Sequence, residues 1–205
     1  VLDDIYYIVK NTDIRNPGGL QLHTPRYLAD LSFALNYRFG GLEVFGYHLV
    51  NVMIHLISAL LVYLLMLLTF RTPYFRKWGI GEAGAGDSGA PRCPSTVGWL
   101  VALFVALLFV VHPIQTQAVT YVVQRMTSMT AMFYLSSLVF YVMARLAMMT
   151  GPKDSSGGTA GERLTLSSLI WLVAATVAAV AAMKTKEIAF TLPLANMHYE
   201  AYFFA

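Results

Sequence analysis

Long apolar runs without charge are the feature that most limits what this chain can fold into. Residues 56–68, 97–111 and 164–183 contain no charged side chain. A helix of about 20 apolar residues spans the hydrocarbon core of a membrane. Charged residues make up 12% of the sequence, about half their share in soluble domains. The pattern predicts an all-α protein, a polytopic bundle of transmembrane helices held in a lipid bilayer.

Five predicted spans and two linkers follow a loop region at residues 1–43. The spans cover residues 44–70, 97–111, 127–149, 164–183 and 188–205 within a membrane region 44–205. The linkers, 71–96 and 150–163, have the Gly- and Ser-rich composition of flexible segments. An amphipathic helix over 27–37 is expected near the membrane interface. Because the chain starts without Met and ends in an apolar stretch, we expect it to be part of a longer membrane protein.

A proline interrupts the pattern after the second span. Pro113 disfavours helical geometry at His112, so we expect the helix to break or bend there. The next helix would run from Gln115 to Met149, which is too long for one span. We expect its polar first part to lie at the surface and to continue into the membrane.

If the spans alternate in direction, the candidate functional residues fall on one membrane face. They are Asp3, Asp4, Arg26, His112, Arg125, Lys184, Lys186 and Glu187. Ionisable groups beside hydrocarbon are costly and mark functional sites. Lys and Arg divide seven to seven between the two faces, so the positive-inside rule does not orient the chain.

The paired carboxylates and Arg26 each allow two interpretations. Adjacent residues point in different directions, so either Asp3 or Asp4 can face a site and act as general base for a hydroxyl acceptor. The alternative is an ordinary helix cap or turn. Arg26 either binds a phosphate group or extends toward the lipid headgroups.

The remaining polar residues also have alternatives. His112 is a ligand, a proton carrier or a helix cap. The run from Lys184 to Glu187 is a phosphate clamp or an interface anchor. His48, Asn51 and His55 share one helix face, as a stripe that packs against neighbouring helices or as the wall of a cavity.

Composition excludes other classes of function. The net charge of +3 is small and no basic stripe with interleaved aromatics exists, which excludes nucleic acid as a partner. The single Cys93 excludes an intrachain disulfide and a cysteine-based metal site. The residues assign no metal ligands.

Several short motifs, taken in order, resemble a known family. They are the LDDIYYIVKN run at 2–11, the segments 24–37 and 45–56, HPIQTQAV at 112–119 with Gln124 and Arg125, and 186–193. Together they resemble GT-C superfamily glycosyltransferases, in particular the tetratricopeptide-repeat-bearing O-mannosyltransferase-like membrane proteins, which include bacterial members. The resemblance covers nearly the whole chain apart from the two linkers.

The resemblance implies a fold, an orientation and an activity. The fold would be a partial GT-C-like bundle, with 1–43 as an extracytoplasmic loop that carries short interfacial helices. The motif face would be periplasmic in a bacterial inner membrane. The donor substrate would be a sugar on a polyprenyl phosphate, and the resemblance leaves open whether a divalent metal is needed.

The resemblance also implies residue roles. Asp3 or Asp4 would activate the acceptor hydroxyl, and a protein is one possible acceptor. The leaving lipid phosphate would be bound by a subset of four bases, Arg26, Arg125, Lys184 and Lys186, and its growing charge makes such contacts valuable. His112 and Glu187 would line the same cavity. The chain departs from the family pattern at Gln117, where many members have Glu, and an amide cannot serve as a base.

Two other interpretations remain open. In the first, the chain is a GT-C-derived accessory subunit without catalytic activity, packed against neighbouring membrane subunits. A transporter or channel fragment ranks last, because the sequence lacks the paired Gly- or Pro-broken helices of transporter sites.

Overall fold

A computed structural model describes residues 8, 10, 11, 24, 26–77, 96–149 and 164–204. In these residues the regular structure is helical throughout and includes no strand, so the predicted all-α fold is confirmed. Three helices are long and apolar enough to cross a membrane, or four if a bent pair counts as one span. The chain is therefore an integral membrane protein.

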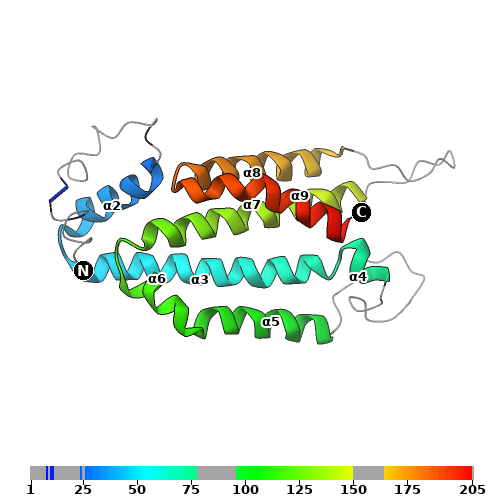
Figure 1. Cartoon of the computed structure of the whole chain (residues 1–205), viewed down its shortest axis with the longest axis horizontal. Helices are drawn as coiled ribbons and strands as arrows, with labels where there is room; N and C mark the ends of the chain where they lie inside the picture. The colour runs from blue at the N-terminus through cyan, green and yellow to red at the C-terminus, as the bar shows by residue number, and fades with distance from the viewer. Residues whose placement is uncertain are drawn as a thin grey trace.

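The helices lie lengthwise beside one another (Figure 1). In chain order they are α2 (Tyr27–Gly40), α3 (Val44–Thr69), α4 (Pro73–Lys77), α5 (Thr96–Val111), η4 (Pro113–Gln115), α6 (Thr116–Thr120), α7 (Arg125–Met149), α8 (Leu166–Met183), η5 (Glu187–Thr191) and α9 (Leu192–Phe203). Helix α7 packs against both α3 and α8, and α3 packs against α5. One end of the bundle carries α2 and α6, and is called the α2 end here. The opposite end, the α4 end, carries α4 and the end of α9.

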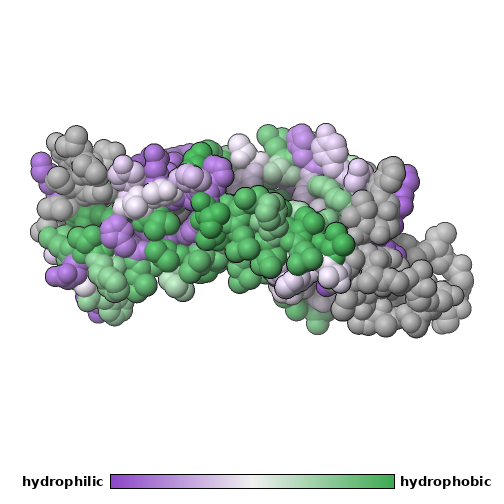
Figure 2. All heavy atoms as spheres, turned by 90° about the horizontal axis from the view of Figure 1, so that it is seen from below, coloured by the Kyte–Doolittle hydropathy of each residue, from purple (hydrophilic) through white to green (hydrophobic). Residues whose placement is uncertain are grey.

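Large apolar side chains of α5 and α8 point away from the bundle, and small ones point inward. The buried positions of α5 are Gly98, Ala102 and Ala106, and those of α8 include Ala175, Ala178 and Ala182. Small residues allow helices to approach closely where lipid replaces water. Figure 2 shows the resulting apolar belt along the bundle. The belt is what a surface in contact with lipid requires.

A tight turn joins α2 to the start of α3. Gly41 has a φ of 58°, in the left-handed region that glycine adopts without steric cost. Its N–H donates to the Tyr37 carbonyl at 2.8 Å, and the Tyr47 hydroxyl donates back to the Gly41 carbonyl at 3.0 Å. The turn therefore holds α2 against the first turns of α3.

The predicted break after the second span is confirmed. Helix α5 ends at Val111, and His112 has an extended backbone before Pro113, as a residue before proline prefers. The axis then bends by 49° into the short helices η4 and α6. The span is thus a bent pair of helices.

The prediction of one continuous helix from Gln115 to Met149 is wrong. Helix α6 ends at Thr120, Tyr121 is extended, and α7 starts at Arg125. The Asn51 side chain donates to the Tyr121 carbonyl at 3.1 Å. The same carbonyl also accepts from the Gln124 N–H at 3.2 Å, so a local turn and a contact from α3 both support the interruption.

The last predicted span, 188–205, contains a 3₁₀ turn and a shorter helix. Helix α9 has 12 residues, about 18 Å of helix, against a hydrocarbon core of about 30 Å. It runs back along α7 toward the α4 end (Figure 1).

Candidate functional site

Arg125 is fully buried at the α2 end, at the start of α7. Its side chain has 0% exposure. Its Nε donates to Asn51 Oδ1 at 2.8 Å, and its Nη2 donates to the Tyr47 carbonyl at 2.8 Å. A longer bond of 3.4 Å joins Nη1 to the Ser32 carbonyl, and the guanidinium lies 4.7 Å from the centre of the Phe33 ring. Arg125 therefore fastens α2 and α3 to α7 in this structure.

The polar stripe of α3 bonds to the bent span. His48 Nδ1 donates to the Val119 carbonyl at 3.2 Å, and His55 Nε2 donates to the Val110 carbonyl at 3.3 Å. Asn51 lies between the two histidines and donates to the Tyr121 carbonyl. A backbone carbonyl only accepts, so each ring nitrogen in these bonds carries the hydrogen. All three side chains of the stripe pack against neighbouring segments, as the first interpretation predicted. His55 also lines a pocket.

The run after α8 meets α2 and α7 at the same end. The Lys184 carbonyl accepts from the Leu28 N–H at 3.2 Å, and Lys186 Nζ donates to Thr127 Oγ1 at 2.9 Å. Arg26 Nε lies 3.7 Å from Glu187 Oε1. These two side chains are 42% and 52% exposed, so their ion pair adds little stability and both remain accessible to a ligand. The structure thus brings Arg26, Lys184, Lys186 and Glu187 together.

His112 lies apart from that group. Its side chain is exposed, and its Nδ1 accepts from the Ile114 N–H at 3.2 Å, which caps η4. Among the described residues no hydrogen bond or ion pair joins it to the four residues at the α2 end. The helix-cap interpretation describes the contact that His112 makes here.

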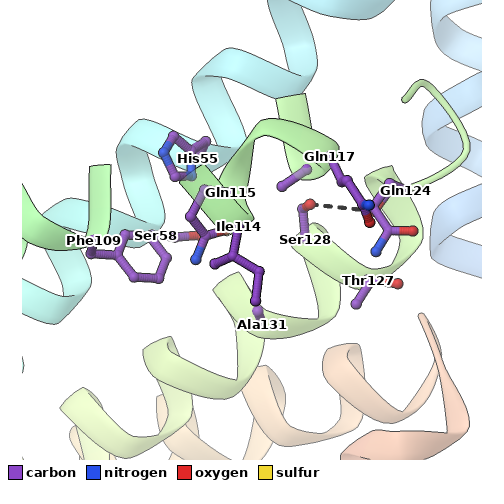
Figure 3. Close-up of a pocket in the computed structure, with 11 residues that line it drawn as sticks. His55, Ser58, Phe109, Ile114, Gln115, Gln117, Gln124, Thr127, Ser128 and Ala131 are labelled. Atoms are coloured by element: carbon purple, nitrogen blue, oxygen red, sulfur yellow. Dashed lines mark hydrogen bonds between the residues drawn. The ribbon is translucent and has the colours of Figure 1, made fainter. Parts of the chain in front are cut away.

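A pocket of about 240 Å³ lies inside the bend between α5 and α7. It is bounded by α3, α5, η4, α6 and α7 (Figure 3). Its polar lining residues are His55, Ser58, Gln115, Gln117, Gln124, Thr127 and Ser128, and its apolar ones are Phe109, Ile114, Ala118 and Ala131. The lining carries amides and hydroxyls without a carboxylate or an ammonium group. Sequence reasoning named Gln117 and Gln124 separately but did not predict that they border one pocket.

Asp3 and Asp4 lie outside the described residues, so their role as base stays a prediction. In the described part of the chain, no group of three or more His, Cys, Asp or Glu side chains is placed to hold a metal ion.

A second charged cluster near the α4 end was missed. Arg145 on α7 forms a bidentate ion pair with Glu200 on α9 through its Nε, at 3.0 Å, and its Nη2. The Tyr141 hydroxyl donates to the same carboxylate at 2.8 Å. The signal in the sequence was a single Arg within an apolar run and a single Glu within another, since charges in spans pair with one another.

The fold and the α2 end define a class: an integral membrane helix bundle with cationic and amide groups gathered at one end. Three curated relatives say more. The chain is 34% identical to the protein O-mannosyl-transferase Tmtc3 of Drosophila melanogaster, over 69% of this chain and 16% of the relative. It is 34% identical to the protein O-mannosyl-transferase tmtc2 of Xenopus laevis, over 87% of this chain and 17% of the relative. It is 30% identical to the protein O-mannosyl-transferase TMTC4 of Mus musculus, over 91% of this chain and 24% of the relative.

The chain is therefore homologous to a segment of these protein O-mannosyl-transferases. It spans between 16% and 24% of the length of these three relatives. No family model matches the sequence, and no solved structure matches it. The predicted resemblance is confirmed as homology to O-mannosyl-transferases, while the bacterial origin and the partial chain stay predictions.

Proposed function

We propose that this chain is the donor-binding region of a membrane glycosyltransferase that moves a sugar from a polyprenyl-phosphate donor to a hydroxyl acceptor. The observation that carries the proposal is homology, over most of the chain, to proteins named O-mannosyl-transferases. The motif face, which is the α2 end, would face away from the cytoplasm, as the periplasmic side of an inner membrane does in a bacterium.

The bases at the α2 end are suited to the leaving group. The bond from sugar to phosphate breaks as negative charge grows on the phosphate oxygen, and nearby cations stabilise that charge. Arg26 and Lys186 are partly exposed, and Lys184 is two residues from Lys186 in the chain. Arg125 contributes in another way, because its donors are directed at α2 and α3. Arg125 would hold this end of the bundle together, while Arg26, Lys184 and Lys186 would contact the phosphate.

Asp3 or Asp4 would take the proton of the acceptor hydroxyl as it attacks the sugar. A positioned carboxylate of this kind contributes about 10²–10⁴-fold to the rate. Glu187 would line the cavity that holds the lipid phosphate, and the acceptor hydroxyl would belong to a protein side chain.

Sugar transfer in membranes tests the proposal. Membranes that contain the chain would be given a radiolabelled polyprenyl-phosphate mannose and an acceptor peptide rich in Ser and Thr. The variants are Asp3→Asn, Asp4→Asn and the double variant, with Glu43→Gln as control because Glu43 is exposed and makes no cap bond. We expect a loss of at least about 100-fold in one single variant and in the double variant, with the control unchanged.

Full transfer in the double variant would remove the proposed base. The absence of transfer by the unaltered chain, with the donor and acceptor shown to be competent in a positive-control membrane, would remove the enzyme proposal. The alternative, a non-catalytic accessory subunit, would then stand.

A further inference from the structure

Three exposed bases lie at the α4 end of the bundle, away from the α2 end. Arg71 lies two residues after the end of α3, and Arg76 and Lys77 are the last residues of α4. All three side chains are exposed. Helix α3 has 26 residues, which make about 39 Å of helix, against a hydrocarbon core of about 30 Å. The bases that follow α3 therefore lie at the depth of the lipid headgroups.

Packing holds α4 in a fixed place at the end of α9 (Figure 1). The centre of the Phe75 ring lies 5.2 Å from that of Phe70 and 6.0 Å from that of Phe203 on α9. The Arg76 N–H donates to the carbonyl of the buried Thr72 at 3.1 Å. The aromatic side of α4 thus faces the bundle and leaves its bases on the outside. A surface that is already ordered loses little conformational freedom when a ligand binds to it.

Tyrosine rings mark the α4 end as a membrane interface. Tyr74 on α4 and Tyr202 on α9 are 49% and 69% exposed. The Tyr74 ring also contacts Phe203, with 6.0 Å between the ring centres. Tyrosine is enriched where hydrocarbon meets water, because its ring is apolar and its hydroxyl is polar. Bases and tyrosines together make a surface suited to contact with headgroups.

The charge of this surface is positive, as far as the described residues go. They place one carboxylate at the α4 end, that of Glu200, and Arg145 neutralises it in their bidentate ion pair. At the α2 end, by contrast, a base and an acid are exposed together, as the pair of Arg26 and Glu187. The α4 end is therefore complementary to an anion.

The anion that is present at this depth is the phosphate group of a phospholipid. A guanidinium binds phosphate oxygens through two parallel hydrogen bonds. Each Lys or Arg near an anionic membrane surface strengthens the association about fivefold. A soluble phosphate ion has the same chemistry, but it is not concentrated at the membrane surface as a lipid is.

We propose that Arg71, Arg76 and Lys77 form a binding surface for the headgroups of anionic phospholipids. The surface lies at the opposite end of the bundle from the residues proposed to bind the sugar donor. The inference is therefore independent of the proposed function and holds whether or not the chain transfers sugar.

Quenching of tryptophan fluorescence by brominated lipid tests the inference at a known place. The three native tryptophans are first replaced by Phe. Tyr202→Trp then gives a reporter at the α4 end, and Phe39→Trp gives a matched reporter on α2, since both residues are exposed aromatics. Each protein is placed in vesicles of dioleoyl phosphatidylcholine that contain rising fractions of brominated phosphatidylglycerol, with brominated phosphatidylcholine as the reference.

The charge-removing variant carries Arg71→Gln, Arg76→Gln and Lys77→Gln. Three bases at about fivefold each set an upper limit of about 100-fold, and salt at 0.1 M screens part of it. We expect the Tyr202→Trp reporter to show a preference of about tenfold for phosphatidylglycerol. This preference should fall to about twofold or less in the charge-removing variant and at 1 M salt. The Phe39→Trp reporter should not respond to that variant.

Further variants separate charge from structure and lipid from free phosphate. Arg71→Lys with Arg76→Lys keeps the charge and should keep most of the preference. Inorganic phosphate at 10 mM should displace no more phosphatidylglycerol than sodium chloride of equal ionic strength. Circular dichroism shows whether each variant keeps its helices.

Three results would overturn the inference. The first is an equal response of the Tyr202→Trp reporter to the two brominated lipids. The second is a preference that survives the loss of all three charges, or that the charge-keeping variant loses as well. The third is displacement by inorganic phosphate beyond the effect of salt, which would assign the surface to a soluble phosphate group.

Discussion

Replacing Arg125 by Lys tests how the α2 end is held together. The buried guanidinium reaches Asn51 Oδ1 and the Tyr47 carbonyl with two different nitrogens, each at 2.8 Å. A lysine ammonium keeps the charge but is a single compact centre. It can reach one of these two acceptors and leaves the other unpaired. We expect Arg125→Lys to destabilise the folded state.

The magnitude follows from the contacts that are lost. A hydrogen bond to a charged group contributes about 1.5–3 kcal/mol, and one of the two short bonds disappears. The guanidinium also lies 4.7 Å and 5.4 Å from the ring centres of Phe33 and Tyr47. Such contacts contribute about 0.5–2 kcal/mol and are only partly kept by lysine. The expected decrease in the free energy of unfolding is about 2–4 kcal/mol.

Reversible unfolding in mixed detergent and SDS micelles, followed by far-UV circular dichroism, measures this change. The matched control is Arg38→Lys, since Arg38 is exposed on α2 and should change stability by no more than about 0.5 kcal/mol. Combining Arg125→Lys with Asn51→Leu should give a coupling of at least about 0.5 kcal/mol, because the two residues are bonded. If Arg125→Lys matches its control, or if the two changes are additive, the proposed role of Arg125 is refuted.

Two further substitutions test other contacts by the same unfolding measurement. Gly46→Ala should lower stability by about 1 kcal/mol, because a Cβ at this position would lie 3.0 Å from Asn36 Nδ2; adding Asn36→Ala should restore most of it. Glu200→Gln should cost about 1–2 kcal/mol, since it weakens a half-buried bidentate pair with Arg145.

Both of these expectations have a clear contrary result. A loss that persists in the Gly46→Ala, Asn36→Ala double variant would show that the amide is not the obstacle. If Glu200→Gln is neutral while Glu43→Gln is neutral too, the ion pair does not fasten α9 to α7.

The positions of the long helices could be read from the sequence because hydrocarbon allows few alternatives. The long apolar runs predict the long helices, and Pro113 marks the break after α5. The interruption at Tyr121 could not be read, since its local sequence allows helix. A hydrogen bond from Asn51, which lies 70 residues away in the chain, supports this interruption.

The site was less predictable than the fold. The sequence predicted that Arg26, Lys184, Lys186 and Glu187 share one end of the bundle, but it did not distinguish buried from exposed residues. Arg125 and Lys186 looked equivalent as phosphate ligands, and their difference comes from partners on other helices. The pocket was missed because amides and hydroxyls carry no signal in the sequence until the bend brings them together. Arg145 and Glu200 were missed for a related reason, as each was an isolated charge in an apolar run.

Hydrogen bonds between the polar stripe of α3 and the bent span mean that the two segments must be compatible in sequence. The carbonyls at Val119, Tyr121 and Val110 accept from the side chains of His48, Asn51 and His55, respectively. A chimera that exchanges residues 110–124 with a relative, but keeps α3, risks losing the three hydrogen bonds that join α3 to the bent span. An exchange that moves both segments together keeps the bend. Chimeras of this chain should therefore exchange α3 and residues 110–124 together, although the two segments lie far apart in the sequence.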